Sequence, residues 1–205
     1  MLSYIFNTVY DDYDAQGIHP KRESIRKYVK GGLSHKSLEK EIGHVLKTHK
    51  LNIETHGDIV TYVVRDPRDV MVSYYHYRKN IKSIDDSTNL HQFIKLNLPQ
   101  WVEHVNEWID RSNSVIRYED AINDLHACLN KLCGDLGVTV DEYVITEAEY
   151  QFSFKNMSGR ERGVSDDSSF FRKGVVGDWK TYLDHSDIEY VEANAKGLML
   201  RLGYD

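Results

Sequence analysis

Cysteine and proline are scarce in this chain of 205 residues. Its two cysteines, Cys128 and Cys133, lie five positions apart on a segment with helical periodicity, so their side chains point in different directions and cannot form a disulfide. Reduced core thiols are typical of cytoplasmic proteins, and we expect that location. Three prolines leave little room for a disordered linker. The composition therefore predicts one domain over residues 1–205.

Long apolar runs and an excess of basic charge are also missing. No run approaches the roughly 20 apolar residues that a bilayer crossing needs, and the first residues lack the basic and apolar regions of a signal peptide. We therefore expect no membrane span. The net charge of −6 and the pI near 5.9 argue against nucleic acid as the main partner. Any basic site must then be local.

What the sequence does contain is an alternation of strand and helix patterns. The predicted strands are 44–49, 59–65 and 114–120. The predicted helices are 2–9, 67–80, one containing Trp101 and Trp108, 122–136 and 188–200. Strands separated by helices predict an α/β fold in which helices flank a parallel sheet.

One stretch, YVVRDPRDVMVSYYHYRK, carries the strongest local signals. The β-branched and aromatic run at 59–64 predicts a strand buried on both faces of the sheet. Asp66 is a good N-cap residue and Pro67 fits the first helical position. Asp69 stands where the acid of a capping box would lie. The pattern predicts strand, tight turn and helix.

At that turn the residue types indicate an anion site. Arg65 ends the strand, and Ser73 follows the cap by almost two helical turns, so both can face the helix N-terminus. A guanidinium, a hydroxyl and backbone N–H groups that converge suit a phosphate.

The alternative interpretation is an ordinary strand-end arginine that pairs with Asp66 or Asp69.

The sequence LKTH holds a second candidate pair. Lys47 and His49 are two apart on a predicted strand and would leave the same face, as a charge stabiliser and a general base. The alternative is chance, because the chain has ten histidines. His44 and His49 would lie on opposite strand faces, and no other spacing suggests metal ligands, so we expect no metal.

A third candidate is the run FRKGVVGDWK. Arg172 and Lys173 precede Gly174, so two cations and a bare backbone can approach an oxyanion together. The alternative is a solvated basic turn whose charge is offset by Asp166 and Asp167. Composition alone favours that alternative.

In their order and separations, YVVRDPRDVMVSYYHY, VIRYED and FRKGVVGDWK resemble the cytosolic sulfotransferase family, with a more bacterial-like end. The resemblance covers about residues 44–180. It implies a P-loop nucleotide-hydrolase-like sulfotransferase fold. It also implies transfer of a sulfonate from 3′-phosphoadenosine 5′-phosphosulfate (PAPS), without a metal, to a hydroxyl or amine of a small-molecule or lipid acceptor.

The resemblance also implies site residues. Arg65 and Ser73 would hold the 3′-phosphate of the nucleotide, and Arg172, Lys173 and Gly174 would close over the same phosphate.

The remaining roles concern the adenine and the transfer itself. Tyr118, expected on the third strand, would contact the adenine. His49 would take the acceptor proton, and Lys47 would stabilise charge on the sulfonate. Such chemistry is mainly in-line positioning and charge neutralisation.

The pattern departs from the family at its start, where a phosphate loop reading roughly P-x-S-G-T-T is expected and not found. We therefore expect a fragment or an internal start, with a natural short form as the alternative. That departure keeps open a second function, a non-catalytic binder of 3′-phosphoadenosine nucleotides. A P-loop kinase is disfavoured, because the chain has no G-x-x-x-x-G-K-[ST].

Overall fold

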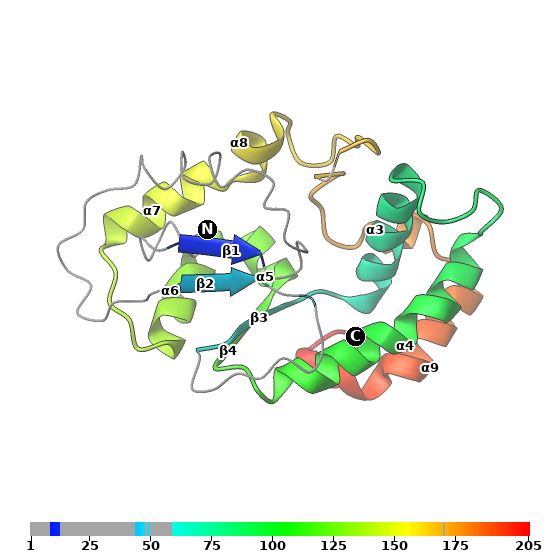
Figure 1. The fold of residues 1–205 in the computed structure, drawn as a ribbon, viewed down its shortest axis with the longest axis horizontal. Helices are drawn as coiled ribbons and strands as arrows, with labels where there is room; N and C mark the ends of the chain where they lie inside the picture. The colour runs from blue at the N-terminus through cyan, green and yellow to red at the C-terminus, as the bar shows by residue number, and fades with distance from the viewer. Residues whose placement is uncertain (1–8, 13–43, 48, 50–58, 170) are drawn as a thin grey trace.

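Parallel strands and helices make up the part of the chain that the computed structural model describes, residues 9–12, 44–47, 49, 59–169 and 171–205 (Figure 1). The strands are β1 Val9–Asp12, β2 His44–Lys47, β3 Thr61–Val64 and β4 Ser114–Arg117. The longer helices are α3 Pro67–Asn80, α4 Leu90–Ile109, α6 Leu125–Asp135, α7 Glu142–Gln151 and α9 His185–Leu202. The shorter ones are α5 Tyr118–Asn123, α8 Phe154–Ser158 and the 3-10 helix η1 Asp178–Thr181.

The strands pair in parallel, as the sequence predicted. β1 pairs with β2, with Val9 opposite His44, and β3 pairs with β4, with Thr61 opposite Ser114. Figure 1 shows α3, α4 and α9 on one side of the β3–β4 pair and α6 and α7 toward the other end of the molecule. This confirms the α/β fold with helices around parallel strands.

The turn from β3 into α3 forms as its residues predict. The Asp66 side chain accepts a hydrogen bond from the Arg68 backbone N–H at 2.8 Å, and Pro67 occupies the first helical position. The Asp66 N–H is itself satisfied, because it donates to the Glu119 carboxylate at 3.0 Å. α3 therefore begins at the predicted residue and ends at the predicted Asn80.

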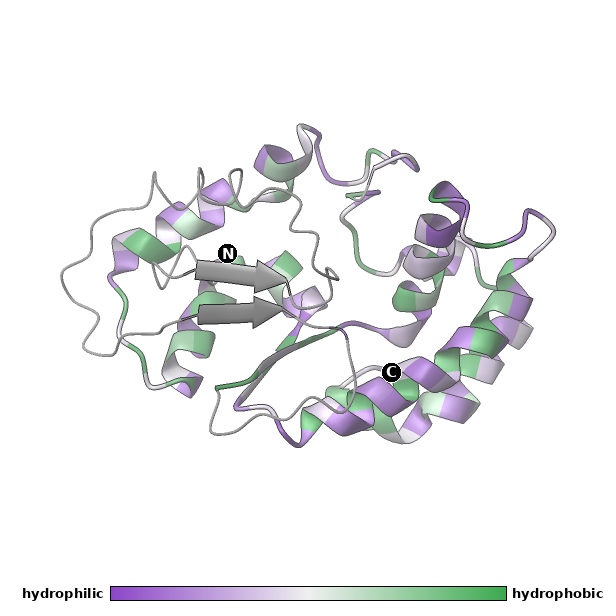
Figure 2. Ribbon diagram, viewed as in Figure 1, coloured by the Kyte–Doolittle hydropathy of each residue, from purple (hydrophilic) through white to green (hydrophobic). Residues whose placement is uncertain are grey.

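Three groups of buried residues form the core of the described part of the chain. The larger one joins β3 and α3 to α4 and α9, whose apolar and polar faces alternate in Figure 2. Its members are Val64, Met71, Val72, Ile94, Leu98, Val105, Leu183, Val191, Ala195, Leu198, Met199, Leu202 and Tyr204. A second group packs Leu129 and Cys133 of α6 against Ile145 and Ala148 of α7. A third packs Cys128 and Leu132 of α6 against Ile116 of β4.

Both cysteines are free and buried on α6, which confirms the prediction of reduced core thiols. Burial raises the pKa of the thiol in Cys128 and in Cys133.

Four sequence predictions need correction. Val9 begins a strand rather than ending a helix, and the rest of that predicted helix lies outside the described residues. Val63 is 60% exposed, so β3 is not buried on both faces. The segment 122–136 is not one helix, because Asp124 has an extended φ of −150° and caps α6 through the Ala127 N–H.

The fourth correction concerns Tyr118. It opens α5 instead of ending a strand, since β4 stops at Arg117. Glu119 and Asp120 then fall in the first turn of α5, where acidic side chains interact favourably with the helix dipole. α7 was not predicted at all.

Candidate functional site

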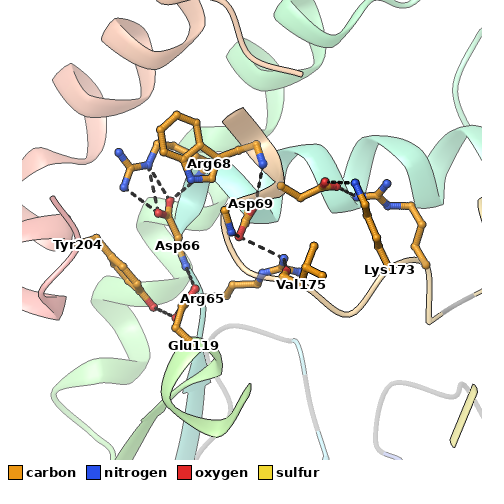
Figure 3. Close-up of polar contacts among 12 residues, drawn as sticks. Arg65, Asp66, Arg68, Asp69, Glu119, Lys173, Val175 and Tyr204 are labelled. Atoms are coloured by element: carbon orange, nitrogen blue, oxygen red, sulfur yellow. Dashed lines mark hydrogen bonds and ion pairs between the residues drawn. The ribbon is translucent and has the colours of Figure 1, made fainter. Parts of the chain in front are cut away.

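Arg65 connects the end of β3 to a loop 110 residues further along the chain. Its Nη2 donates to the Val175 carbonyl at 3.0 Å and lies 3.3 Å from the Asp69 carboxylate (Figure 3). The guanidinium carbon sits 4.3 Å from the centre of the Tyr118 ring. Within the described residues, its buried Nε has no hydrogen-bond partner. Arg65 thus pairs with Asp69, as the alternative interpretation expected. It also contacts the basic loop (residues 171–177), which the resemblance implied would lie near it.

Asp69 is the anchor of that loop rather than a capping-box acid. Its side chain is 1% exposed and accepts from the Gly177 N–H at 2.8 Å and from the Trp179 N–H at 3.0 Å. The capping role is not available, because the Asp66 N–H already donates to Glu119. Asp69 therefore ties the first turn of α3 to the beginning of η1.

Arg172 and Lys173 both bind the buried carboxylate of Asp178. Lys173 Nζ lies 2.6 Å from Oδ1, and Arg172 Nη2 donates to Oδ2. Burial alone would raise the pKa of Asp178, but the hydrogen bonds from these two cations outweigh it and the pKa is lowered. The acid expected in the solvated-turn alternative, Asp167, is also within ion-pair distance of Arg172 at 3.9 Å, but the shorter bonds go to the buried Asp178.

Gly174 is required by the backbone at the centre of this loop. Its φ is +66°, a conformation that side-chain-bearing residues adopt at a cost. A Cβ atom there would also lie 2.4 Å from the Phe154 ring. The loop therefore passes closely over α8 at the residue that follows the two cations.

Ser73 lies in the second turn of α3, four residues after Asp69, so both side chains share one helix face. His76 follows on the same side, with its ring 4.8 Å from that of Tyr182. Burial, and then the positive charge of Arg172, lower the pKa of His76. This face of α3 is thus the one turned toward the basic loop.

Tyr118 lies beneath Arg65, at the point where β4 passes into α5. Burial raises the pKa of its hydroxyl, mainly by removing the phenolate from water. The ring and the guanidinium therefore form one side of the site. The structure thus places Tyr118 next to Arg65, in the first turn of a helix rather than on the predicted strand.

Lys47 and His49 fall at the end of β2. The strand finishes at Lys47, and His49 lies just beyond it with an exposed side chain. The predicted strand therefore includes Lys47 but not His49.

Several residues of the site had no distinguishing signal in the sequence. Asp178 was visible only as an acid of the basic run, and the folded chain pairs it with Arg172 and Lys173. The pairing of Asp69 with Arg65 was one of the sequence alternatives, but its bonds to the loop amides were not. Arg160 was not singled out either, although it bonds to the carbonyl groups of Phe171 and Arg172. The GDWK part of the basic run was the only available hint at Asp178.

Neither a metal-binding cluster nor a membrane-spanning helix occurs among the described residues. No group of three or more histidine, cysteine, aspartate or glutamate residues in that part of the chain could hold a metal ion. None of its helices combines the length and the apolar character that crossing a membrane requires.

Arg65 and Tyr118 thus lie at the ends of the parallel strands β3 and β4, the place where ligands bind in open α/β sheets, and the loop with Arg172 and Lys173 approaches them there. A family model described as "Sulfotransferase domain" matches residues 48–203. The chain belongs to that family.

Individual relatives agree with this assignment. The chain is 31% identical over 149 residues to a 3-beta-hydroxysteroid sulfotransferase of Cavia porcellus, with 63% of this chain and 52% of the relative covered. It is 26% identical to an amine sulfotransferase of Oryctolagus cuniculus, with 60% and 48% covered. The chain therefore spans about half the length of these relatives.

Solved structures agree as well. One is the mouse sulfotransferase SULT7A1 complexed with PAP (3′-phosphoadenosine 5′-phosphate). It is 26% identical to this chain with a TM-score of 0.58, and the match covers 69% of this chain and 58% of that one. Retinol dehydratase with androsterone and inactive cofactor PAP is 25% identical with a TM-score of 0.57, covering 69% and 47%. Both likenesses support the sulfotransferase fold.

Proposed function

We propose that this protein transfers a sulfonate group from PAPS to a hydroxyl or amine of a small-molecule or lipid acceptor. The observation that carries the proposal is the reach of Arg65 from the end of β3 to the Val175 carbonyl, over the Tyr118 ring. These contacts bring together all three of the motifs that resemble the family. PAP in the two solved relatives supports PAPS as the co-substrate.

The residues fit a 3′-phosphate even though each cation has a carboxylate partner. Arg65 and Arg172 carry five N–H donors each. Arg65 is engaged through Nη2, and Arg172 bonds Asp178 through Nη2 and the Tyr182 hydroxyl through Nη1, so each guanidinium keeps donors for a second anion. Lys173 keeps two of its three donors after bonding Asp178. Ser73 adds a hydroxyl, and Gly174 lets the backbone approach closely. These five groups would bind the phosphate.

The transfer itself would use three other residues. Tyr118 would contact the adenine and so fix the direction of the nucleotide. His49 would take the proton from the acceptor, and Lys47 would neutralise charge on the sulfonate oxygens, in an in-line transfer. PAPS supplies the sulfonate, and this chain supplies orientation, charge and a base.

The acceptor class comes from the relatives. A hydroxysteroid, an amine and androsterone or retinol appear in the names of similar proteins. We propose a hydroxyl as the usual nucleophile, with an amine as the alternative. We assign the reaction to the cytoplasm on the basis of the two unpaired buried thiols.

The test is transfer from PAPS to a 3β-hydroxysteroid and to an alkylamine, with wild type and His49→Ala, together with calorimetric titration of PAP. Removing the base should lower turnover by about 10²- to 10⁴-fold. The PAP dissociation constant should stay within about twofold, since His49 is not assigned to the phosphate site.

Two results would contradict parts of the proposal. A His49→Ala variant with substantial turnover would remove His49 from the base role. A wild-type chain that binds PAP but sulfonates neither acceptor would favour the non-catalytic nucleotide binder instead.

A further inference from the structure

Arg160 holds the basic loop by side-chain hydrogen bonds to backbone carbonyl groups. Among the described residues, the cations Arg172 and Lys173 of the loop make no bond of this kind to the loop backbone, whereas Arg160 makes two. Its Nη1 donates to the Val164 carbonyl at 2.7 Å and to the Arg172 carbonyl at 3.2 Å, and its Nη2 donates to the Phe171 carbonyl. The nearest carboxylate, Asp166, is 3.9 Å away. The hydrogen bonds of the guanidinium thus go to carbonyl groups, with Asp166 as a more distant ion-pair partner.

Backbone hydrogen bonds support the same loop from the same side. The Gly163 N–H donates to the Lys173 carbonyl at 2.9 Å, and the Asp166 N–H donates to the Arg172 carbonyl at 2.9 Å. The segment 160–166 thus lies along 171–173 and occupies the carbonyl groups of both cationic residues. The side chains of Arg172 and Lys173 leave in another direction, toward Asp178.

The base of the segment is also fixed. The Arg160 N–H donates to Ser158 Oγ at 3.1 Å, immediately after α8. The Arg160 guanidinium lies 5.9 Å from the centre of the Phe154 ring, the ring that packs against Gly174. Arg160 therefore connects the end of α8, through Ser158, to the carbonyl groups of Phe171 and Arg172 in the basic loop.

From these contacts we propose that Arg160 is a positioning residue for the anion site. By holding the carbonyl groups of Phe171 and Arg172, it turns the negative ends of these peptide dipoles away from the side on which the cations are presented. The ordering of the segment is then complete before an anion binds, which lowers the entropy lost on binding. The identity of the anion as a 3′-phosphate rests on the proposed function.

A lysine cannot reproduce this arrangement. The guanidinium spreads its donors over a planar fork and reaches three carbonyl groups at once, whereas an ammonium is a point charge on a flexible stem. Arg160→Lys therefore keeps the positive charge and removes the geometry. It separates a positioning role from a general electrostatic one.

Arg162 provides a matched control on the same segment. Its side chain is exposed and donates to the Ile122 carbonyl at 2.7 Å, which belongs to α5 and not to the basic loop. Arg162→Lys makes the same chemical change two residues away.

The experiment compares the full chain with Arg160→Lys and Arg162→Lys in two measurements. Hydrogen exchange reports the Gly163 and Asp166 amides, and calorimetric titration gives the dissociation constant of PAP. In Arg160→Lys we expect faster exchange of both amides and PAP binding weaker by at least about tenfold, or about 1.4 kcal/mol. Arg162→Lys should match the wild type in both.

Each of the other possible results would refute one part of the proposal. Unchanged exchange in Arg160→Lys refutes the positioning role, whatever happens to binding. Faster exchange with an unchanged PAP affinity refutes the link between the ordered segment and the anion site. A wild-type chain that does not bind PAP refutes the proposed function, while the exchange rates still decide whether Arg160 holds the segment.

Discussion

The carboxylate of Asp178 accepts hydrogen bonds from Arg172 and Lys173 at a position where its side chain is 4% exposed. Asp69, which is 1% exposed, likewise pairs with Arg65 and accepts hydrogen bonds from two loop amides. The proposed phosphate site thus contains two buried acids. We interpret them as groups that hold the cations and the loop in place, because cations gathered without counter-charges would repel one another.

The lowered pKa of Asp178 predicts a pH dependence of folding. A carboxyl whose folded pKa lies below its ordinary 3.8 stabilises the fold above that pH, and this contribution is lost as the pH falls through the folded pKa. Asp178→Asn removes it. The wild type should therefore exceed Asp178→Asn in free energy of unfolding at neutral pH, by a difference that shrinks below pH 3.8. Urea unfolding across this range measures it.

The control is Asp167→Asn, which removes the same charge from an exposed side chain 3.9 Å from Arg172. A difference between wild type and Asp178→Asn that stays constant with pH would contradict the prediction.

At the scale of elements, the helices fall into two packing groups with different tasks. α3, α4 and α9 share the core cluster that also contains Val64 at the end of β3, directly before Arg65. α6 and α7 bury their own cluster around Leu129 and Ile145. The two clusters share no residue, and α6 packs on β4 through a third cluster, Ile116 with Cys128 and Leu132, to which Leu129 does not belong. Damage to the α6–α7 cluster should therefore cost stability and leave the anion site in place.

Leu129→Ala tests this division. Leu129 is 0% exposed, and truncating such a leucine costs about 2–5 kcal/mol through lost burial and the cavity left behind. Asn130→Ala, at an exposed position of the same helix, should change the free energy of unfolding by no more than about 0.5 kcal/mol. Denaturant unfolding measures both. PAP affinity of folded Leu129→Ala should match the wild type, and a large loss of affinity would mean that the two groups are coupled.

On the scale of the whole molecule, the site is a local basic feature of an acidic chain. The net charge is −6, yet three cations meet where segments 110 residues apart come together. An anion bound by both Arg65 and Arg172 would contact the end of β3 and the basic loop at the same time. Binding should therefore stabilise the folded chain as a unit.

Thermal unfolding with PAP and with 5′-AMP measures this stabilisation. PAP at about a hundred times its dissociation constant should stabilise by roughly 2.7 kcal/mol and raise the melting temperature. An equal concentration of 5′-AMP should have a much smaller effect, because it lacks the 3′-phosphate that the cations are assigned to bind. Equal shifts with both nucleotides, or none with either, would contradict the assignment of Arg65 and Arg172.

Local chemistry alone determined much of this protein. The bounds of α3, its Asp66 cap, the parallel α/β class and the free buried thiols all follow from rules that act within a few residues. The order of the three motifs also led to the correct family.

Only the tertiary structure decided what each charge touches. Asp69 fits a local capping rule, but its carboxylate binds amides 108 and 110 residues away. Asp178 and Arg160 take their partners from the path of the 160–178 loop, and Tyr118 enters a helix because β4 ends one residue earlier. Hydrogen bonds of buried charges are made with whichever groups the packed chain brings within reach, and a short stretch of sequence does not specify those groups.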